Sequence, residues 1–237
     1  MNIGFFGDSY VDVTKSKWPG DLIGELDAGL MSSGMGGANQ YYAVDTWNQV
    51  QTQLANSNNR LDYAIWTFTW VDRLYRETGV GLAPIVEVML AWAERREPRV
   101  HYENEKEIKQ AIGLYFKYLH DKPESLFYYT LMLKWILALP AQYPNTRFIF
   151  IPNTEVARKI ALTNFDQGVL LDFAFETLSN RETASPCVMP CDCRRLGHLN
   201  ETNHDRVRAM VKDLVVNYEQ YRNTIYQVDY SRFDIAA

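Results

Sequence analysis

The chain has 237 residues, of which 47% are hydrophobic and 22% charged, and its formal net charge is −5. This composition is that of a globular protein long enough to bury a large core, and it fits a single domain spanning 1–237. An acidic chain without a basic tract is not expected to bind nucleic acid, because it offers few cations to neutralise phosphates.

The first part of the chain alternates apolar runs with segments of helical spacing. The expected elements are a buried strand at Asn2–Phe6, a helix from Trp18 to about Leu26, a short strand running into a glycine loop at Leu30–Gly37, a helix over Asn39–Leu54 and a strand at Leu61–Trp70.

A long helical stretch follows, with candidate helices at Ala83–Arg95, Glu105–Leu119 and Ser125–Leu139. The block of about 75–145 is too long for a simple crossover between strands, so we expect a helical insertion. Its apolar stripes are typical of a core, and a lid or the interface of a homo-oligomer is the alternative.

The last part is expected to contain a strand at Arg147–Pro152, a helix over Asp166–Ser179, an irregular loop at 185–197 and a final helix over Asn203–Tyr221, capped by Asn200 or Thr202. The strand runs are continuously apolar, as in buried parallel strands. The sequence therefore predicts a three-layer, flavodoxin-like α/β sandwich around a mainly parallel sheet.

Three motifs could meet at the carboxyl edge of this sheet, where ligands bind in such folds. Gly7-Asp8-Ser9 directly follows the first strand, a glycine loop follows the second, and His198 precedes the final helix. A serine nucleophile needs a base such as histidine, and backbone N–H groups of a glycine loop can hold an oxyanion. Taken singly, each motif is more typical of a turn, a tight loop or a surface histidine.

Together these motifs resemble the SGNH, or GDSL-type, hydrolases, in which a Gly-Asp-Ser block carries the nucleophile and a late block carries the acid and base. The matching segments are Gly7–Tyr10, Gly36–Asn39 and His198–His204. The resemblance implies that Ser9 is the nucleophile, that His198 is the base, that the Ser9 and Gly37 N–H groups are oxyanion donors, and that His204 is structural.

Two blocks depart from the family pattern. The family's third block supplies an Asn to the oxyanion hole, but the segment Trp66–Arg73 has none, and Thr69 is the candidate donor in its place. The family's acid precedes the histidine by three residues, a position that Arg195 occupies. Asp192, six residues before His198, is the candidate to orient that histidine.

Four residues in or near these motifs are candidates for binding the substrate: Asp8, Tyr10, Asn39 and Arg73. For Asp8 the alternative is a structural role, in which its carboxylate ties the turn to backbone N–H groups. For Arg73 the alternative is an ordinary surface position.

Cys187, Cys191 and Cys193, with His198, contain the ligand types of a structural zinc site. The spacing is unusual and there is no second Cys-x-x-Cys pair, so we expect reduced thiols in a loop, and neither a metal nor a cofactor. If His198 bound zinc, it could not act as a base.

The chain also lacks the sequence features of membrane insertion and export. Its longest apolar region, Ser125–Leu139, contains Lys134 and is shorter than a membrane-spanning helix, and Met1-Asn2 does not begin a signal peptide. Three cysteines do not make a disulfide framework. We therefore expect a protein of the cytoplasm, or of the host cytoplasm or virion if it is viral, without a membrane partner.

The predicted function is a serine esterase or acyl hydrolase that acts without a cofactor on an ester or O-acetyl group, carried by a small molecule or a carbohydrate. The alternative is a weakly active or inactive module with the same scaffold, which binds or builds a larger assembly such as a virus particle. An acyltransferase using the same site is a third hypothesis.

Overall fold

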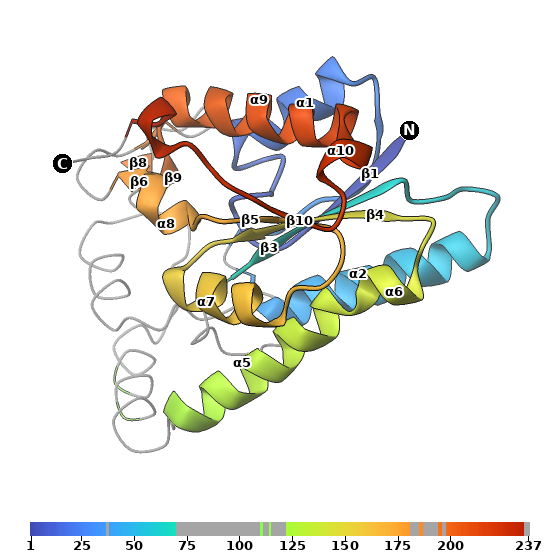
Figure 1. Cartoon of the computed structure of the whole chain (residues 1–237), viewed down its shortest axis with the longest axis horizontal. Helices are drawn as coiled ribbons and strands as arrows, with labels where there is room; N and C mark the ends of the chain where they lie inside the picture. The colour runs from blue at the N-terminus through green and yellow to red at the C-terminus, as the bar shows by residue number, and fades with distance from the viewer. Residues whose placement is uncertain are drawn as a thin grey trace.

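The computed structural model describes residues 1–36, 38–69, 110, 114, 122–180, 185–186, 194–195 and 198–234. Six of its strands form one sheet in the order β10-β5-β4-β3-β1-β2, and all neighbouring strands are parallel (Figure 1). The strands are β1 (Asn2–Phe6), β2 (Gly29–Ser32), β3 (Tyr63–Phe68), β4 (Arg147–Pro152), β5 (Val169–Leu171) and β10 (Thr224–Tyr226). The predicted α/β fold with a parallel sheet is therefore confirmed.

Helices cover both faces of the sheet (Figure 1). One face carries α1 (Lys17–Glu25), α9 (Glu201–Val216) and α10 (Tyr218–Tyr221), and the other carries α2 (Gln40–Ala55), α5 (Lys122–Leu137), α6 (Leu139–Gln142) and α7 (Glu155–Asn164). Successive side chains of a strand point to opposite faces. Thus Tyr63 and Ile65 of β3 belong to the core beneath α1 and α9, whereas Trp66 and Phe68 belong to the core beneath α2, α5 and α7.

Short elements lie beyond the carboxyl ends of the central strands (Figure 1). They include α8 (Phe175–Leu178), β6 (Ser179–Asn180) and β9 (His198–Leu199), and β6 pairs antiparallel with β9. Two further antiparallel strands, β7 (Ser185–Pro186) and β8 (Arg194–Arg195), pair with each other, and a 3-10 helix spans Tyr230–Arg232.

The helix predicted over Asp166–Ser179 is wrong. This segment contains β5, which pairs with β4 and β10, and only the single-turn helix α8. The helix of this region is α7, which begins after Thr154, whose hydroxyl accepts the N–H of Ala157 (3.1 Å). A short apolar run that is buried on both faces lacks the alternation that would separate a strand from a helix.

Most of the predicted helical insertion, residues 70–121 apart from 110 and 114, lies outside the described residues. The first candidate helix lies there entirely, and so does the second except for residues 110 and 114. The third candidate corresponds to α5, which buries Tyr129, Leu133 and Ile136 in the core beneath the sheet. Among the helices that the structure describes, none has both the length and the hydropathy of a membrane-spanning segment.

Candidate active site

The turn that carries Ser9 directly follows β1. The N–H of Val11 donates to the carbonyl of Asp8 (3.1 Å), and the N–H of Tyr10 donates to the Asp8 carboxylate (3.1 Å). The carbonyl of Ser9 accepts a hydrogen bond from the hydroxyl of Ser16 (2.5 Å). An aspartate that accepts from the N–H two residues later is a common device for fixing a turn. These bonds hold the peptide of Ser9 in one orientation at the carboxyl edge of the sheet.

A buried side-chain bond ties this turn to β4. Asn153, the first residue after β4, donates from Nδ2 to Asp8 Oδ1 over 3.0 Å, and both side chains are fully buried. Because β3 lies between β1 and β4, the bond spans the end of β3. A buried carboxylate needs hydrogen-bond donors to offset its desolvation, and Asn153 supplies one. Asp8 thus serves as a structural part of the turn.

Gly7 lies directly against β3. In the register of the sheet Phe6 pairs with Trp66, so Gly7 stands beside Thr67. The φ angle of Gly7 is +154°, and a Cβ at this position would lie 1.9 Å from Thr67 Oγ1. No side chain fits there, so glycine is what allows β1 and β3 to stay together where the chain begins its turn toward Ser9.

The loop after β2 packs against Ser9. A Cβ placed on Gly36 would lie 3.9 Å from the Cβ of Ser9. The N–H of Gly36 donates to Asp12 Oδ2 (2.8 Å) and is therefore already engaged. Gly37, the predicted oxyanion donor, lies outside the described residues. Backbone of this loop is close to Ser9, which an oxyanion hole built from backbone donors requires.

Neutral polar groups gather where β3 ends. The N–H of Thr69 donates to Gln40 Oε1 (2.9 Å), and its carbonyl accepts from the hydroxyl of Tyr129 (2.5 Å). Among the described residues, the hydroxyls of Thr67 and Thr69 and Oδ1 of Asn153 are buried with no hydrogen-bond partner. Buried polar atoms of native proteins nearly always bind protein or ordered water. The end of β3 therefore has unused hydrogen-bonding capacity, and the hydroxyl of Thr69, the predicted third oxyanion donor, is part of it.

Two of the predicted substrate contacts serve the fold. Tyr10 is buried and stacks on Phe175 of α8, with ring centroids 4.7 Å apart and ring planes at 3°. Asn39 is buried and caps α2 by accepting the N–H of Tyr42 (2.9 Å). Arg73, the remaining candidate apart from Asp8, is not among the described residues.

The backbone of His198 enters the same region through β9. Asn180 in β6 pairs with His198, and the next residue, Leu199, is buried in the core that also contains Tyr10 and Phe175. The side chain of His198 lies outside the described part of the chain, and so does the whole of Asp192. The contact between Ser9 and its predicted base therefore stays a prediction.

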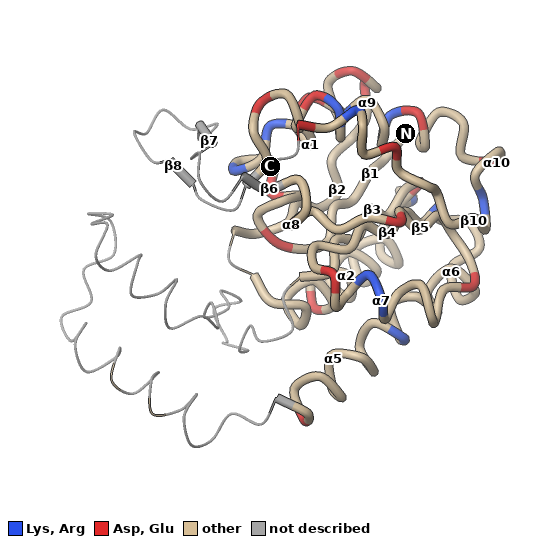
Figure 2. The backbone as a smooth tube through the Cα atoms, turned by 60° about the vertical axis from the view of Figure 1, so that its left-hand side comes forward, with Lys and Arg blue, Asp and Glu red and all other residues tan. Residues whose placement is uncertain are grey.

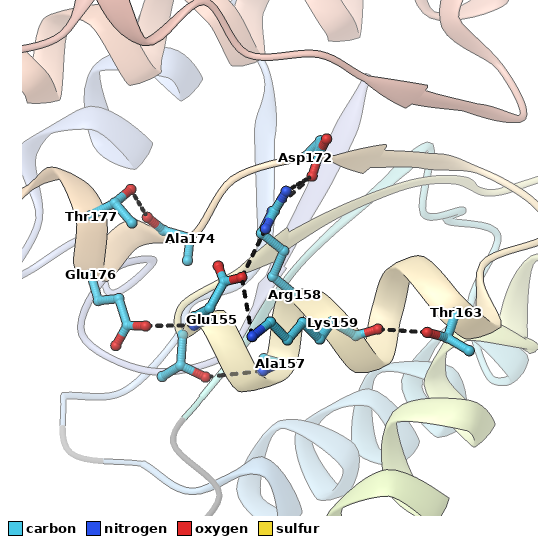
Figure 3. A network of polar contacts seen from close by, with 10 residues as sticks. Glu155, Ala157, Arg158, Lys159, Thr163, Asp172, Ala174, Glu176 and Thr177 are labelled. Carbon is cyan, nitrogen blue, oxygen red and sulfur yellow. Dashed lines mark hydrogen bonds and ion pairs between the residues drawn. The ribbon is translucent and has the colours of Figure 1, made fainter.

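A polar network between α7, α8 and Asp172 lies next to the end of β4 (Figure 3). The N–H of Glu176 donates to the carbonyl of Asn153 (2.9 Å), and the Glu176 carboxylate accepts the N–H of Glu155 (2.5 Å). Arg158 forms ion pairs with Glu155 (2.9 Å) and with Asp172 after β5 (2.6 Å). The network joins the start of α7 to α8, and it thereby holds the backbone of the residue that binds Asp8.

His204, which the family resemblance makes structural, is buried in α9. Its side chain is 7% exposed, and Nδ1 has no hydrogen-bond partner in the described ranges. Burial, and secondly the nearby Lys17 ammonium, lowers the pKa of His204 from 6.5 to about 4. The imidazole is therefore neutral at pH 7.

We expect His204 to make the stability of the fold depend on pH below 6.5. The unfolded chain binds a proton at this histidine near pH 6.5, whereas the folded chain binds it only near pH 4, so acidification through this window favours unfolding. The expected loss between pH 7.5 and pH 5 is about 2 kcal/mol, which His204→Gln should remove. Urea unfolding of both proteins at the two pH values measures the difference, and identical pH dependences would contradict the expectation.

Within the described ranges, no group of three or more His, Cys, Asp or Glu could hold a metal ion. Cys187, Cys191 and Cys193 lie outside those ranges, so the zinc hypothesis stays a hypothesis. Comparison with protein-family models, curated proteins and solved structures found no match to this chain.

Sequence reasoning missed two residues of this site, Asn153 and Gln40. Asn153 carries the same signal as Ser9, because it is a polar residue shortly after an apolar strand, in the segment "RFIFIPN". Gln40 carries no such signal. It is the first residue of α2, and only the tertiary fold brings its amide to the backbone of Thr69.

Proposed function

We propose that this chain is a serine hydrolase of the SGNH type that cleaves an ester, such as an O-acetyl group on a carbohydrate. The observation that carries the proposal is the position of Ser9, in a fixed turn after β1, at the sheet edge where the strand order reverses between β1 and β3. Ligands of open α/β sheets bind at this place. The glycine loop after β2 lies against the same residue, which suits acyl transfer.

In the proposed reaction, the hydroxyl of Ser9 attacks the acyl carbonyl while His198 accepts its proton. The N–H groups of Ser9 and Gly37, with the hydroxyl of Thr69, stabilise the oxyanion. Collapse of the tetrahedral intermediate releases the alcohol, which takes the proton from His198. Water then attacks the acyl-enzyme and gives a proton to His198, which returns it to Ser9. Asp192 is the proposed group that orients His198.

A binding or structural module on the same scaffold is the second candidate. It is favoured by the burial of the site, because Ser9 is only 6% exposed and Asp8 and Thr69 are fully buried. A nucleophile has to meet its substrate. Arg195 also stands where the family resemblance calls for a carboxylate. Such a module would act through its outer surfaces in a larger assembly.

Labelling with a fluorophosphonate probe, which reacts with activated serines, tests the proposal. We expect one adduct per chain, located on Ser9 by peptide mass spectrometry, and no adduct in Ser9→Ala. Hydrolysis of p-nitrophenyl acetate should fall at least about a thousand-fold in Ser9→Ala.

Ser33→Ala is the matched control, because Ser33 lies in the neighbouring loop and its hydroxyl is bonded to the backbone of Val13 and Gly34. This variant should label like the wild type. A folded wild-type chain that takes up no probe, or a Ser9→Ala variant that is labelled equally, would exclude the hydrolase and leave the binding module.

A further inference from the structure

The side-chain amide of Gln40 lies where β1 leaves the sheet. Successive residues of a strand direct their backbone N–H and C=O groups to alternate neighbours. The carbonyl of Phe68 accepts the N–H of Asn153 (3.0 Å) and so faces β4, which directs the N–H of Thr69 toward β1. The acceptor that Thr69 finds there is Oε1 of Gln40 (2.9 Å) instead of a carbonyl of β1.

The chain that follows β1 turns away from β3 at this level. The carbonyl of Gly7 accepts the N–H of Met35 (3.2 Å) and therefore faces the loop after β2. Gln40 follows that loop, which packs against Ser9. The amide of Gln40 is thus held from two sides, by Thr69 and by the loop that contacts Ser9. It lies between the ends of β1 and β3, where the strand order reverses.

The bond to Thr69 also fixes the direction of the amide. A backbone N–H can only donate, so the atom of Gln40 that faces it is the oxygen, and Nε2 lies on the other side of the amide. Gln40 is 2% exposed, and its Nε2 is buried with no hydrogen-bond partner in the part of the chain that the structure describes. An amide nitrogen has two hydrogens to donate, and native proteins rarely leave a buried donor unused.

The position of Nε2 favours an acceptor with negative charge. Gln40 is the first residue of the 16-residue helix α2, and the amino end of a helix attracts anions. Strands β1 and β3 contain no charged residue, whereas α1 and α9 contain several (Figure 2). A neutral donor such as an amide can stabilise negative charge at the ends of two strands that offer no cation.

We propose that Gln40 is a further catalytic residue, whose Nε2 donates a hydrogen bond to the oxyanion; this inference rests on the proposed hydrolase function. When Oγ of Ser9 bonds to the acyl carbon, an electron pair of the carbonyl moves to its oxygen, and the Ser9 proton moves to His198. Nε2 keeps both hydrogens throughout, and its bond strengthens as the oxygen becomes negative. The electron pair returns to the carbonyl when the alcohol leaves.

Steady-state kinetics with p-nitrophenyl acetate provide the first test. Gln40→Met keeps the length of the side chain but removes the donor, so we expect kcat to fall about 100-fold or more while KM changes less than about three-fold. Tyr129→Phe is the matched control, because it removes the hydrogen bond to the carbonyl of Thr69, the same residue that binds Gln40 (2.5 Å). Its kcat should stay within about three-fold of the wild type.

Gln40→Glu separates the donor from the acceptor in a second test. The introduced carboxyl group keeps an oxygen for the N–H of Thr69, and burial should raise its pKa. The carboxylate repels the oxyanion, whereas the protonated group can donate a hydrogen bond again. We therefore expect the kcat of Gln40→Glu, divided by that of the wild type, to rise about ten-fold or more from pH 8 to pH 5.5. Circular dichroism checks that both proteins are folded at both pH values.

A kcat that survives Gln40→Met, in a wild type that is labelled at Ser9, would overturn this inference and leave the hydrolase in place. A Tyr129→Phe variant that loses as much kcat as Gln40→Met would overturn it too, because the effect then comes from a displaced Thr69. If Gln40→Met does not fold, a ratio for Gln40→Glu that does not change with pH overturns the inference instead. A wild type that is neither labelled at Ser9 nor active excludes the proposed function, and this inference with it.

Discussion

Gly7→Ala is expected to destabilise the protein by about 3 kcal/mol or more, as measured by urea unfolding followed by circular dichroism. The added Cβ would lie 1.9 Å from Thr67 Oγ1 and 3.1 Å from the carbonyl oxygen of Thr67, so β1 and β3 would have to separate at the edge that carries Ser9. Probe labelling of Ser9 should fall with stability, because the turn that follows Gly7 loses its position.

Two further variants isolate the steric cause. Thr67→Ala removes Oγ1 and should restore part of the stability of Gly7→Ala in the double variant, although the carbonyl contact at 3.1 Å remains. Gly24→Ala, in α1, is the control, because a Cβ there has no neighbour within 4 Å. It should stabilise the protein by up to about 1 kcal/mol through helix propensity. Equal effects of the substitutions at Gly7 and Gly24 would contradict the close contact with Thr67.

Asn153→Ala is the second variant with a large expected effect, a loss of about 2 to 3 kcal/mol in the free energy of unfolding. It removes the Nδ2 donor from the Asp8 carboxylate, which is fully buried and keeps its bond from the N–H of Tyr10. A buried carboxylate that loses a hydrogen-bond donor no longer has that bond to offset its desolvation. Urea unfolding at pH 7 measures the loss.

Asn153→Asp sharpens this test because the side chain keeps nearly the same shape but replaces attraction to the Asp8 carboxylate with repulsion. It sets a second carboxylate against Asp8, so at pH 7 it should destabilise the protein more than Asn153→Ala does. Asn56→Ala removes an exposed amide bonded to the Thr52 carbonyl and should cost under about 0.5 kcal/mol. A cost as small as this for Asn153→Ala would show that the bond to Asp8 is dispensable.

The sheet was predictable wherever a strand is a long, continuously apolar run. Strands β1, β3 and β4 meet this condition, and each is followed within a few residues by a polar residue or glycine. Strand β5 does not, because its three residues are followed closely by Phe173 and Phe175, whose spacing also fits a helix. Strand β10 lies at the sheet edge and exposes Thr224 and Ile225, so it has no buried run to detect.

The candidate site was predictable only from the order of strands and motifs. Placing Ser9 after β1 and the glycine loop after β2 brings them to one sheet edge, because parallel strands end on the same side. The local roles of side chains could not be read this way. Tyr10 and Asn39 belong to the matching segments, but Tyr10 stacks on Phe175 in the core. Asn39 caps α2, because the first N–H groups of a helix need an acceptor from outside the helix.

Asp8 and Asn153 lie 145 positions apart, so the bond between them closes a long loop of the chain. Closing so long a loop is slow, and in this sheet β3 must already lie between β1 and β4. A partly folded chain with only β1 and β3 in place would contain the Gly7-Asp8-Ser9 sequence while its aspartate lacked the amide partner. The serine turn therefore has all its bonds to the sheet only when β1, β3 and β4 are all in place.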